Sequence, residues 1–264
     1  TAYEIKECDW SSDVCSSDLL PWWPMFPDRW QVLRRPACAY STRMAFTGFP
    51  TAAVEFYEGL VADNSRTFWL ANKAVYDTSV KAPMEALLAD LDEFGPFKIF
   101  RPYNDVRFAK NRPPYKENIG AYGESEGGAG FYVGFDAGGL YVGSGYYAMQ
   151  SDQLERFRAA VLGDATGAEV ESLVRSARKR GLEPGAISEL KTAPRGVPKD
   201  HPRIELLRRK GLMAGRRFDL APWMHTKAVV AKVRDTWNAA APLNEWLDLH
   251  VGPSTLAPFE FGAE

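Results

Sequence analysis

Residues 127–142 read GGAGFYVGFDAGGLYV, and the fold prediction starts from this stretch. Aromatic and β-branched residues, which favour strands, occupy 131–135 and 140–142. The residues between them, 137–139, include two glycines, which suit the positive φ angles of a tight hairpin turn. The stretch therefore predicts two antiparallel strands joined by that turn.

The chain before this hairpin has helical periodicity. Residues 53–61 repeat apolar side chains at helical spacing, and Ser65 is a good N-cap for a helix that continues to Tyr76. An apolar stripe over 80–94 predicts another helix, which Gly95 would end. Helices are therefore expected to precede the sheet.

Two further features complete the fold prediction. Residues 98–103 and 106–110 have strand character and flank Asn104-Asp105, which predicts a second antiparallel pair. After the hairpin, helical periodicity returns in five segments, at 151–162, 168–179, 203–210, 223–237 and 243–249. The pattern predicts an α+β fold with a central antiparallel sheet, flanked by N-terminal and C-terminal helices.

The first residues resemble translated library DNA. Residues 1–19 can be converted back into codons that resemble the primer and the index-side adapter of short-read sequencing libraries, with room for an index between them. Segments of this kind are set aside in fold reasoning. We therefore expect residues 1–43 to be an artefactual or disordered extension, Met44 to be the true start, and residues 44–264 to form a single α+β domain.

Composition narrows the function classes for residues 44–264. All three cysteines precede this range, so disulfides, thiolate catalysis and cysteine-bound zinc are excluded within it. Removing the five basic and six acidic residues of 1–43 from the totals of 32 and 34 leaves 27 and 28, so any basic surface must be local. The chain has no apolar run of about 18 residues and no recognisable export signal, so we expect a cytoplasmic protein without a membrane partner.

Two basic segments are the candidates for a binding site. The first, residues 98–116, has one acid, Asp105, among interleaved aromatic residues and six cations. These cations are Lys98, Arg101, Arg107, Lys110, Arg112 and Lys116. The second segment, residues 191–210, contains Lys191, Arg195, Lys199, His201, Arg203, Arg208, Arg209 and Lys210. Within it, Asp200-His201-Pro202 predicts a helix start, where backbone N–H groups favour an anion.

We predict that the two segments form a basic cleft for a phosphorylated or carboxylated small molecule, because guanidinium groups bind such anions through paired hydrogen bonds. The expected ligand-binding residues are Arg101, Arg107, Lys110, Lys116, Arg195 and Lys199. Asp105 and His201 are the acid–base candidates if the molecule is also transformed, since each lies beside cations that tune its charge. The sequence does not decide whether the protein is an enzyme, and the cofactor is unknown.

Two other function classes remain open. In the first, the protein has a structural or interaction role, and the basic segments form internal ion pairs with acids on the helices. In the second, cations and aromatic residues contact a nucleic acid. The near-zero net charge and the absence of a recognised binding module count against a nucleic acid.

Three local motifs are rejected as functional signals. Residues 123–127 (GESEG) fit the nucleophile pattern G-x-S-x-G, but that elbow needs a strand before it and a helix after it, whereas we expect a loop and then a strand. The glycines of 127–130 precede a strand and not a helix, so they are no dinucleotide fingerprint. The histidines lack metal-ligand spacing, so no metal site is predicted.

Several motifs from Phe46 onward resemble one family. They are FTGFP at 46–50, Asn64-Ser65-Arg66 with Trp69, Lys73 and Tyr76, KIFRPYNDVRF at 98–108 with PYK at 114–116, and PRG at 194–196 with KDHP at 199–202. In this order and spacing they resemble the uncharacterised family catalogued as domain of unknown function 2461. The resemblance covers essentially Met44 onward and implies a coherent domain found in bacteria and some fungi, with no assigned activity.

Overall fold

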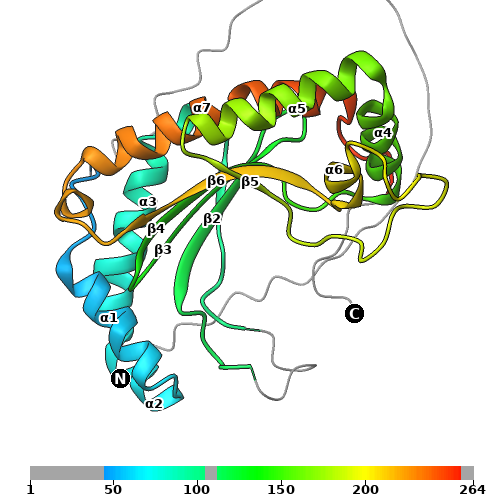
Figure 1. Ribbon diagram of the computed structural model, residues 1–264. Coiled ribbons are helices and arrows are strands. Elements are labelled where there is room, and N and C mark those ends of the chain that lie inside the picture. The colour runs from blue at the N-terminus through cyan, green and yellow to red at the C-terminus, as the bar shows by residue number, and fades with distance from the viewer. Residues whose placement is uncertain (1–44, 105–111, 257–264) are drawn as a thin grey trace, which may run out of the picture. The chain divides into compact units, whose positions relative to one another are not determined.

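The fold is built on a six-stranded antiparallel sheet with the strand order β1-β2-β3-β4-β6-β5 (Figure 1). The computed structural model describes residues 45–104 and 112–256, all within the unit Thr42–Glu264. The strands are β1 (Phe97–Ile99), β2 (Asn118–Glu124), β3 (Gly130–Asp136), β4 (Gly139–Tyr146), β5 (Glu183–Gly185) and β6 (Leu212–Asp219). The α-helices are α1 (Thr51–Ala62), α2 (Arg66–Val75), α3 (Ala82–Ala89), α4 (Ser151–Leu162), α5 (Asp164–Lys179), α6 (Ile204–Arg208) and α7 (Ala228–His250). The predicted α+β class, with helices from both ends of the chain flanking the sheet, is confirmed.

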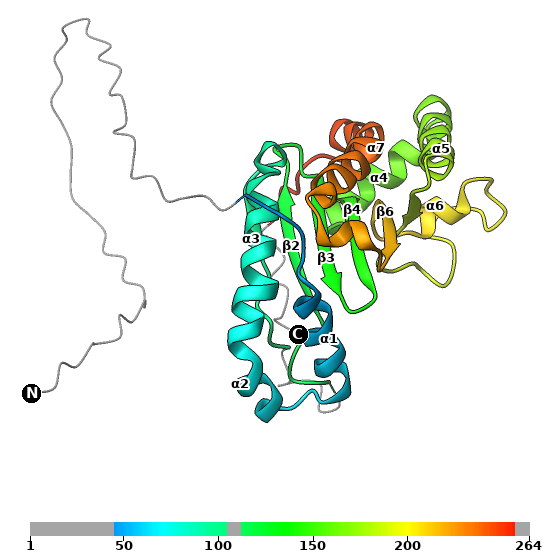
Figure 2. The same ribbon diagram turned by 90° about the vertical axis from the view of Figure 1, so that its left-hand side faces the viewer.

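The helices before the sheet form where the sequence predicts them, with one change. The hydroxyl of Ser65 caps α2 by accepting a hydrogen bond from the backbone N–H of Phe68 at 3.1 Å. The chain then forms a π-helical segment at 76–81 before α3, and Pro83 lies in the first turn of α3. The wider π-helical turn accommodates a proline, which has no N–H to donate. Helices α2 and α3 therefore run on as one rod beside β2 (Figure 2).

The predicted hairpin is present as β3 and β4. Its loop is Ala137-Gly138, and Gly139 has a φ of +127°. A Cβ atom at Gly139 would lie 2.2 Å from the carbonyl oxygen of Phe218 on β6. Glycine is therefore required both by the backbone conformation and by the close approach of β6.

The first strand of the pair predicted over 98–110 is shorter than expected. β1 ends at Ile99 and pairs with β2, which includes the start of the GESEG motif, where a loop was expected. Beyond β1, Tyr103 and Tyr115 form only an isolated antiparallel bridge. Pro102 has no N–H for a regular ladder there. The predicted second strand, 106–110, lies outside the described residues.

The C-terminal half differs from the prediction in three elements. β6 falls in a segment expected to connect two helices, and it pairs with β4 along its whole length. The helices predicted at 223–237 and 243–249 are one 23-residue helix, α7, which continues through Pro242 because its apolar side packs on the sheet. Neither α7 nor any other described helix is long and apolar enough to cross a membrane. α6 begins at Ile204, so Asp200 is not its N-cap.

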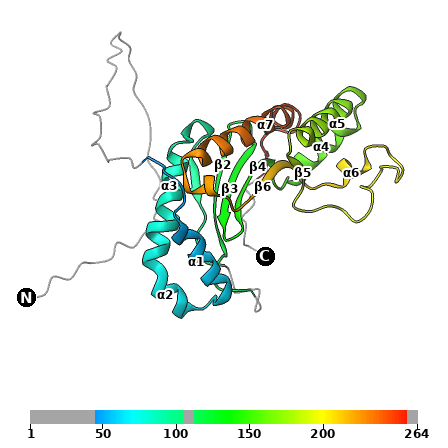
Figure 3. The ribbon, with the colours of Figure 1, turned by 60° about the vertical axis from the view of Figure 1, so that its left-hand side comes forward.

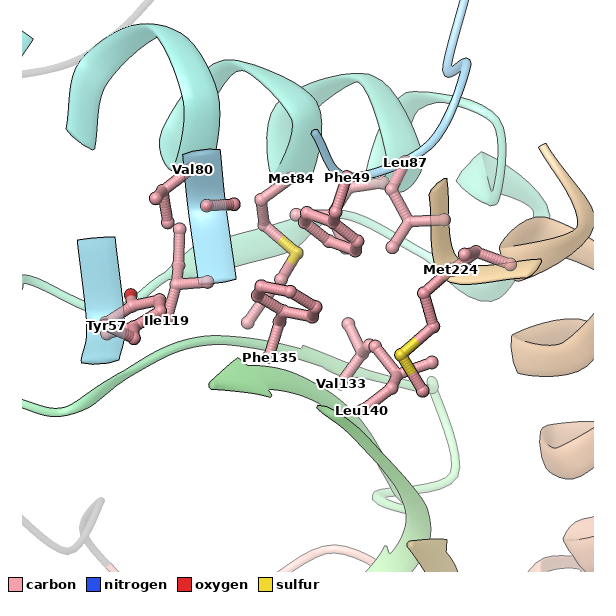
Figure 4. Close-up of a cluster of buried hydrophobic side chains, with 14 of the residues drawn as sticks. Phe49, Tyr57, Val80, Met84, Leu87, Ile119, Val133, Phe135, Leu140 and Met224 are labelled. Carbon is pink, nitrogen blue, oxygen red and sulfur yellow. The ribbon is translucent and has the colours of Figure 1, made fainter. Parts of the chain in front are cut away.

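Every sheet side chain in the two hydrophobic cores lies on the same face of the sheet. The first core fills the space between this face and helices α1 to α3, where Phe49 stacks on Phe135 with ring centroids 4.2 Å apart (Figure 4). The second core lies against α4, α5 and the C-terminal half of α7. α7 contributes Trp237 to the first core and Trp246 to the second, and it crosses the strands between them (Figure 3). The helices thus leave the opposite face of the sheet without core side chains.

Candidate functional site

Glycine and tyrosine build the face of the sheet opposite the cores, which we call the open face. Because alternate residues of a strand share a face, the register assigns the side chains of four neighbouring strands to it. Its glycines are Gly120, Gly130, Gly134, Gly139, Gly143, Gly145 and Gly215, and its tyrosines are Tyr122, Tyr132 and Tyr141. Helices α5 and α7 lie along the other face (Figure 1).

The tyrosine rings rest on glycine backbone. A Cβ atom at either of the paired residues Gly120 and Gly134 would lie 2.7 Å from the hydroxyl oxygen of Tyr132. A Cβ atom at Gly215 would lie 2.5 Å from the hydroxyl oxygen of Tyr141. Side chains larger than hydrogen would therefore push the rings off the sheet. Both tyrosines remain partly exposed, so the glycines allow flat rings that pack on backbone on one side and meet solvent on the other.

The rings form a row across the sheet. The ring centroids of Phe100 and Tyr132 are 6.4 Å apart, and those of Tyr132 and Tyr141 are 5.9 Å apart. Phe100 is 39% exposed, and Tyr147, which directly follows β4, is 46% exposed. The hydroxyl of Tyr132 accepts a hydrogen bond from the Asn118 amide at 3.2 Å, which fixes the middle ring. The row is an aromatic surface that no described helix covers.

Positive charge gathers at the Phe100 end of the row. The ammonium nitrogen of Lys116 lies 5.3 Å from the centroid of the Phe100 ring. Partial burial lowers the pKa of Lys116, and the nearby positive charges of Arg101 and Arg112 lower it further. Among the described residues, no carboxylate forms an ion pair with these three cations. The end of the row therefore carries a cationic cluster, which we call the Lys116 cluster.

The backbone that carries Lys116 is held by α2 and its N-terminal turn. The ring of Tyr115 stacks on Trp69 with centroids 4.5 Å apart. The side-chain amide of Asn64 donates to the carbonyl oxygen of Tyr115 and its oxygen accepts from the Tyr115 N–H, both at 3.0 Å. A second amide, that of Asn104, donates to the carbonyl oxygens of Pro113 and Tyr115. These contacts give Lys116 a fixed position at the edge of the open face.

The charges farther along the open face are arranged differently. Arg217, opposite Tyr141 in the register, donates two hydrogen bonds to the carboxylate of Asp136, at 2.8 and 2.5 Å. Glu183, on the outermost strand β5, is close enough to Tyr141 to raise the pKa of that tyrosine, after the larger effect of burial. On the open face, the described charges beside Tyr141 are thus the Arg217–Asp136 ion pair and Glu183, whereas those beside Phe100 are the cations of the Lys116 cluster.

The family of the chain follows from a match to a family model. The family model described as Conserved hypothetical protein (DUF2461) matches residues 52–246. The chain belongs to this family. The match runs from α1 into α7 and includes all six strands, so the open face lies within the DUF2461 domain. No curated protein and no solved structure matched the chain.

Two of the predicted ligand-binding residues of the first basic segment, 98–116, lie near one another in the structure. Arg101 and Lys116, both predicted as ligand-binding residues, are near enough for the charge of Arg101, like that of Arg112, to add to the lowering of the Lys116 pKa that burial causes. Arg101 is exposed and Lys116 is half-buried. Asp105, Arg107 and Lys110 lie outside the described residues.

The second predicted segment lies elsewhere in the described structure. Arg195 lines a surface pocket of about 360 Å³ between α4 and the loop 194–197, together with Glu155 and Arg158. No residue of the first segment lines this pocket, which includes one basic residue from α4 and an acid. Lys199 is exposed to solvent. The lining of the pocket gives no support to one cleft shared by the two segments.

The side chain of His201 stabilises a turn of the backbone before α6. The Nδ1 atom of its ring accepts a hydrogen bond from the backbone N–H of Arg203 at 3.1 Å, and the backbone N–H of His201 donates to the carbonyl oxygen of Pro198. The neighbouring arginines pair with acids, Arg203 with Glu171 at 3.1 Å and Arg209 with Glu189 at 3.5 Å. Much of the second segment therefore ties α5, α6 and the preceding loop together.

The rejected GESEG motif needs one correction. β2 precedes Ser125, so the expected loop before it is wrong, but β3 follows and the motif is a hairpin turn. The Ser125 hydroxyl accepts from the N–H of Ala129 at 3.0 Å. The carboxylate of Asp248 accepts a hydrogen bond from the Tyr146 hydroxyl at 3.0 Å. Burial raises the pKa of Asp248 by more than this hydrogen bond lowers it. These contacts hold the turn against α7. The described residues contain no group of three or more metal-ligating side chains.

Sequence reasoning missed the rings of the open face. From the sequence, Tyr132, Tyr141 and Phe100 are predicted only as ordinary strand residues. A signal was present, because glycine and tyrosine alternate with apolar residues through 118–147. Period-two alternation of apolar residues with glycine indicates a strand whose second face is bare backbone. Large rings on such a face must lie on the sheet surface.

Proposed function

We propose that the protein binds an anionic small molecule at the Lys116 cluster, with Lys116 and Arg101 as the main contacts. The observation that carries this proposal is the set of three neighbouring cations without a described carboxylate partner. Burial lowers the pKa of Lys116 most, and the positive charges of Arg101 and Arg112 lower it further, because like charges held close together destabilise one another. A bound phosphate or carboxylate would offset this repulsion.

Two properties of the cluster suit an anion. Arg101 can present two N–H groups to a phosphate or carboxylate, and Lys116 can add a point charge. Lys116 is half-buried over the ring of Phe100, so water screens its charge less than it screens a fully exposed lysine. The proposal is narrower than the cleft predicted from the sequence, because Arg195 and Lys199 are left out.

Isothermal titration of the whole chain with inorganic phosphate, ribose 5-phosphate and citrate tests this proposal. We expect the double variant Arg101→Ala, Lys116→Ala to lose affinity about tenfold or more, since charge-assisted hydrogen bonds are lost. Lys179→Ala, which removes an exposed lysine from α5, is the matched control and should bind as the parent does. Added salt should weaken binding.

Two results would count against the proposal. If none of these anions binds the parent, or if the double variant binds as well as the parent, the Lys116 cluster is not an anion site. Arg195→Ala tests the wider cleft separately. An equal loss in that variant would extend the site to the loop 194–197.

A structural role is the second candidate, and the second basic segment favours it. The guanidinium group of Arg203 contacts Glu171 and also donates to the carbonyl oxygens of Val161 and Gly163, each at 3.1 Å. These bonds join the end of α4, the start of α5 and the turn before α6. Arg203→Ala should therefore lower the urea midpoint and leave the affinity for anions unchanged.

A further inference from the structure

The aromatic row and the Lys116 cluster are parts of one surface. Lys116 touches the ring of Phe100, and the Phe100 ring lies beside that of Tyr132. Neighbouring centroids along Phe100, Tyr132 and Tyr141 are 6.4 and 5.9 Å apart. A ligand held at the cationic end would therefore have aromatic rings within the length of a small molecule.

The rings are held in place before any ligand arrives. Tyr132 lies over the glycine pair Gly120 and Gly134, and the Asn118 amide holds its hydroxyl. A tyrosine has few rotatable bonds, and one supported on backbone loses little further freedom when a planar group stacks on it. A surface built in this way favours stacking of flat, π-bonded groups.

We infer that the open face binds a nucleoside phosphate, with the base stacked on the rings of Tyr132 and Phe100 and the phosphate at the Lys116 cluster. The inference rests on the proposed function, because it places the phosphate at the same cations. Bases stack on aromatic side chains through the π-face that every base has, while lysine and arginine hold the phosphate. Glu183, near Tyr141 toward the β5 edge, would repel a phosphate there, which favours a phosphate at the cationic end of the row.

Other ligand classes fit less of this surface. A simple anion such as phosphate would use the cations and leave the row of rings without a contact. A neutral ring would use the tyrosines and leave the Lys116 cluster uncompensated. A nucleoside phosphate satisfies both parts, and it can come from a free nucleotide or from a single-stranded nucleic acid.

Titration calorimetry with four probes tests the inference on the whole chain. The probes are adenosine 5′-monophosphate, ribose 5-phosphate, adenosine and a short single-stranded oligodeoxyadenylate. We expect adenosine 5′-monophosphate or the oligonucleotide to bind at least about tenfold more tightly than ribose 5-phosphate, which has the phosphate without the base. Tighter binding of the oligonucleotide, with a steep salt dependence, would identify single-stranded nucleic acid as the source.

Variants separate stacking from charge. Tyr132→Leu keeps an apolar cover over the glycines but removes the ring, so it should weaken nucleotide binding about tenfold and leave ribose 5-phosphate within twofold. Tyr132→Phe keeps the ring but loses the hydroxyl that the Asn118 amide holds, so it should bind nucleotides more tightly than Tyr132→Leu does. Phe100→Leu, at a more exposed position, provides a second test if Tyr132→Leu does not fold. Lys116→Ala should weaken both phosphate probes.

The outcomes distinguish the two proposals. If ribose 5-phosphate binds as tightly as both base-containing phosphates, or if the loss of a ring changes nothing, the nucleoside inference is overturned and anion binding at the Lys116 cluster stands. If the base-containing phosphates bind and Lys116→Ala has no effect, the phosphate is elsewhere and both proposals fail. Failure of every probe to bind overturns both as well.

Discussion

Gly134 and Gly145 both lie buried on the open face, but different atoms cover them, and replacing each by alanine should therefore have different costs. A Cβ atom at Gly134 would lie 2.7 Å from the hydroxyl oxygen of Tyr132, at the far end of a side chain. A Cβ atom at Gly145 would lie 2.5 Å from the carbonyl oxygen of Leu212 and 2.6 Å from the Cα atom of Met213. Gly145 also has a φ of +134°.

The magnitudes follow from these contacts. Alanine at Gly145 would be strained by about 1–3 kcal/mol at its φ angle, and overlap with the backbone of β6 would add about 1–3 kcal/mol. Alanine at Gly134 would displace Tyr132 and break its bond from Asn118, at about 0.5–1.5 kcal/mol. The lower entropy of the unfolded chain would offset this by about 0.4–1 kcal/mol. We expect Gly134→Ala to cost about 1 kcal/mol at most, and Gly145→Ala at least about 2 kcal/mol.

Equilibrium unfolding in urea measures both values. With a slope of about 2 kcal/mol per molar urea, Gly145→Ala should lower the midpoint by about 1 M or more and Gly134→Ala by about half of that or less. Equal losses in the two variants would mean that the Tyr132 ring does not lie on Gly134 as a movable cover. A neutral Gly145→Ala would refute the close approach of β4 and β6.

Three further predictions address the core, the pH dependence and the cationic cluster. Ser144→Ala should lower the free energy of unfolding by about 1–3 kcal/mol, because the buried side-chain amide of Asn244 would lose its acceptor at 2.6 Å. The double variant Ser144→Ala, Asn244→Leu should lose less stability than Ser144→Ala alone, as measured by urea unfolding. Burial acts to raise the pKa of Asp152, but hydrogen bonds from the C-terminal segment and from a neighbouring arginine lower this pKa overall. The parent should therefore lose stability as the pH falls below about 4, and Asp152→Asn should lose less stability over the same range in thermal melts. The lowered pKa of Lys116 should make it acylate faster than exposed lysines at mildly alkaline pH, and Arg101→Ala should slow the reaction by removing a like charge, which peptide mass spectrometry would detect.

Local patterns predicted much of the fold correctly. The hairpin of β3 and β4, the Ser65 cap and most helices follow from glycine placement and periodicity over a few residues. β6 was missed although its side chains alternate, because the helical segments around it dominated the interpretation. The break expected within α7 was wrong because burial of the helix outweighs the proline inside it, and burial is a tertiary effect.

The candidate site was only partly predictable. Charge counting found Arg101 and Lys116 but grouped them with Arg195, which lies in a separate pocket beside α4. Charge runs along a chain do not tell which cations meet, because that depends on strand order and register. The role of Tyr132 needed both the register and the glycine across the ladder.

The sequence by itself determined the local elements, the α+β class, the family and the near-neutral balance of the residues after Met44. Each of these depends on neighbouring residues, on composition or on motif spacing. Only the tertiary structure decided which face of the sheet receives the helices and which cations have no described partner. These depend on pairings between distant segments, such as β1 with β2 and β4 with β6. The open face exists because the helices bury one face of the sheet, and the glycines on the other face leave room for rings instead of a second core.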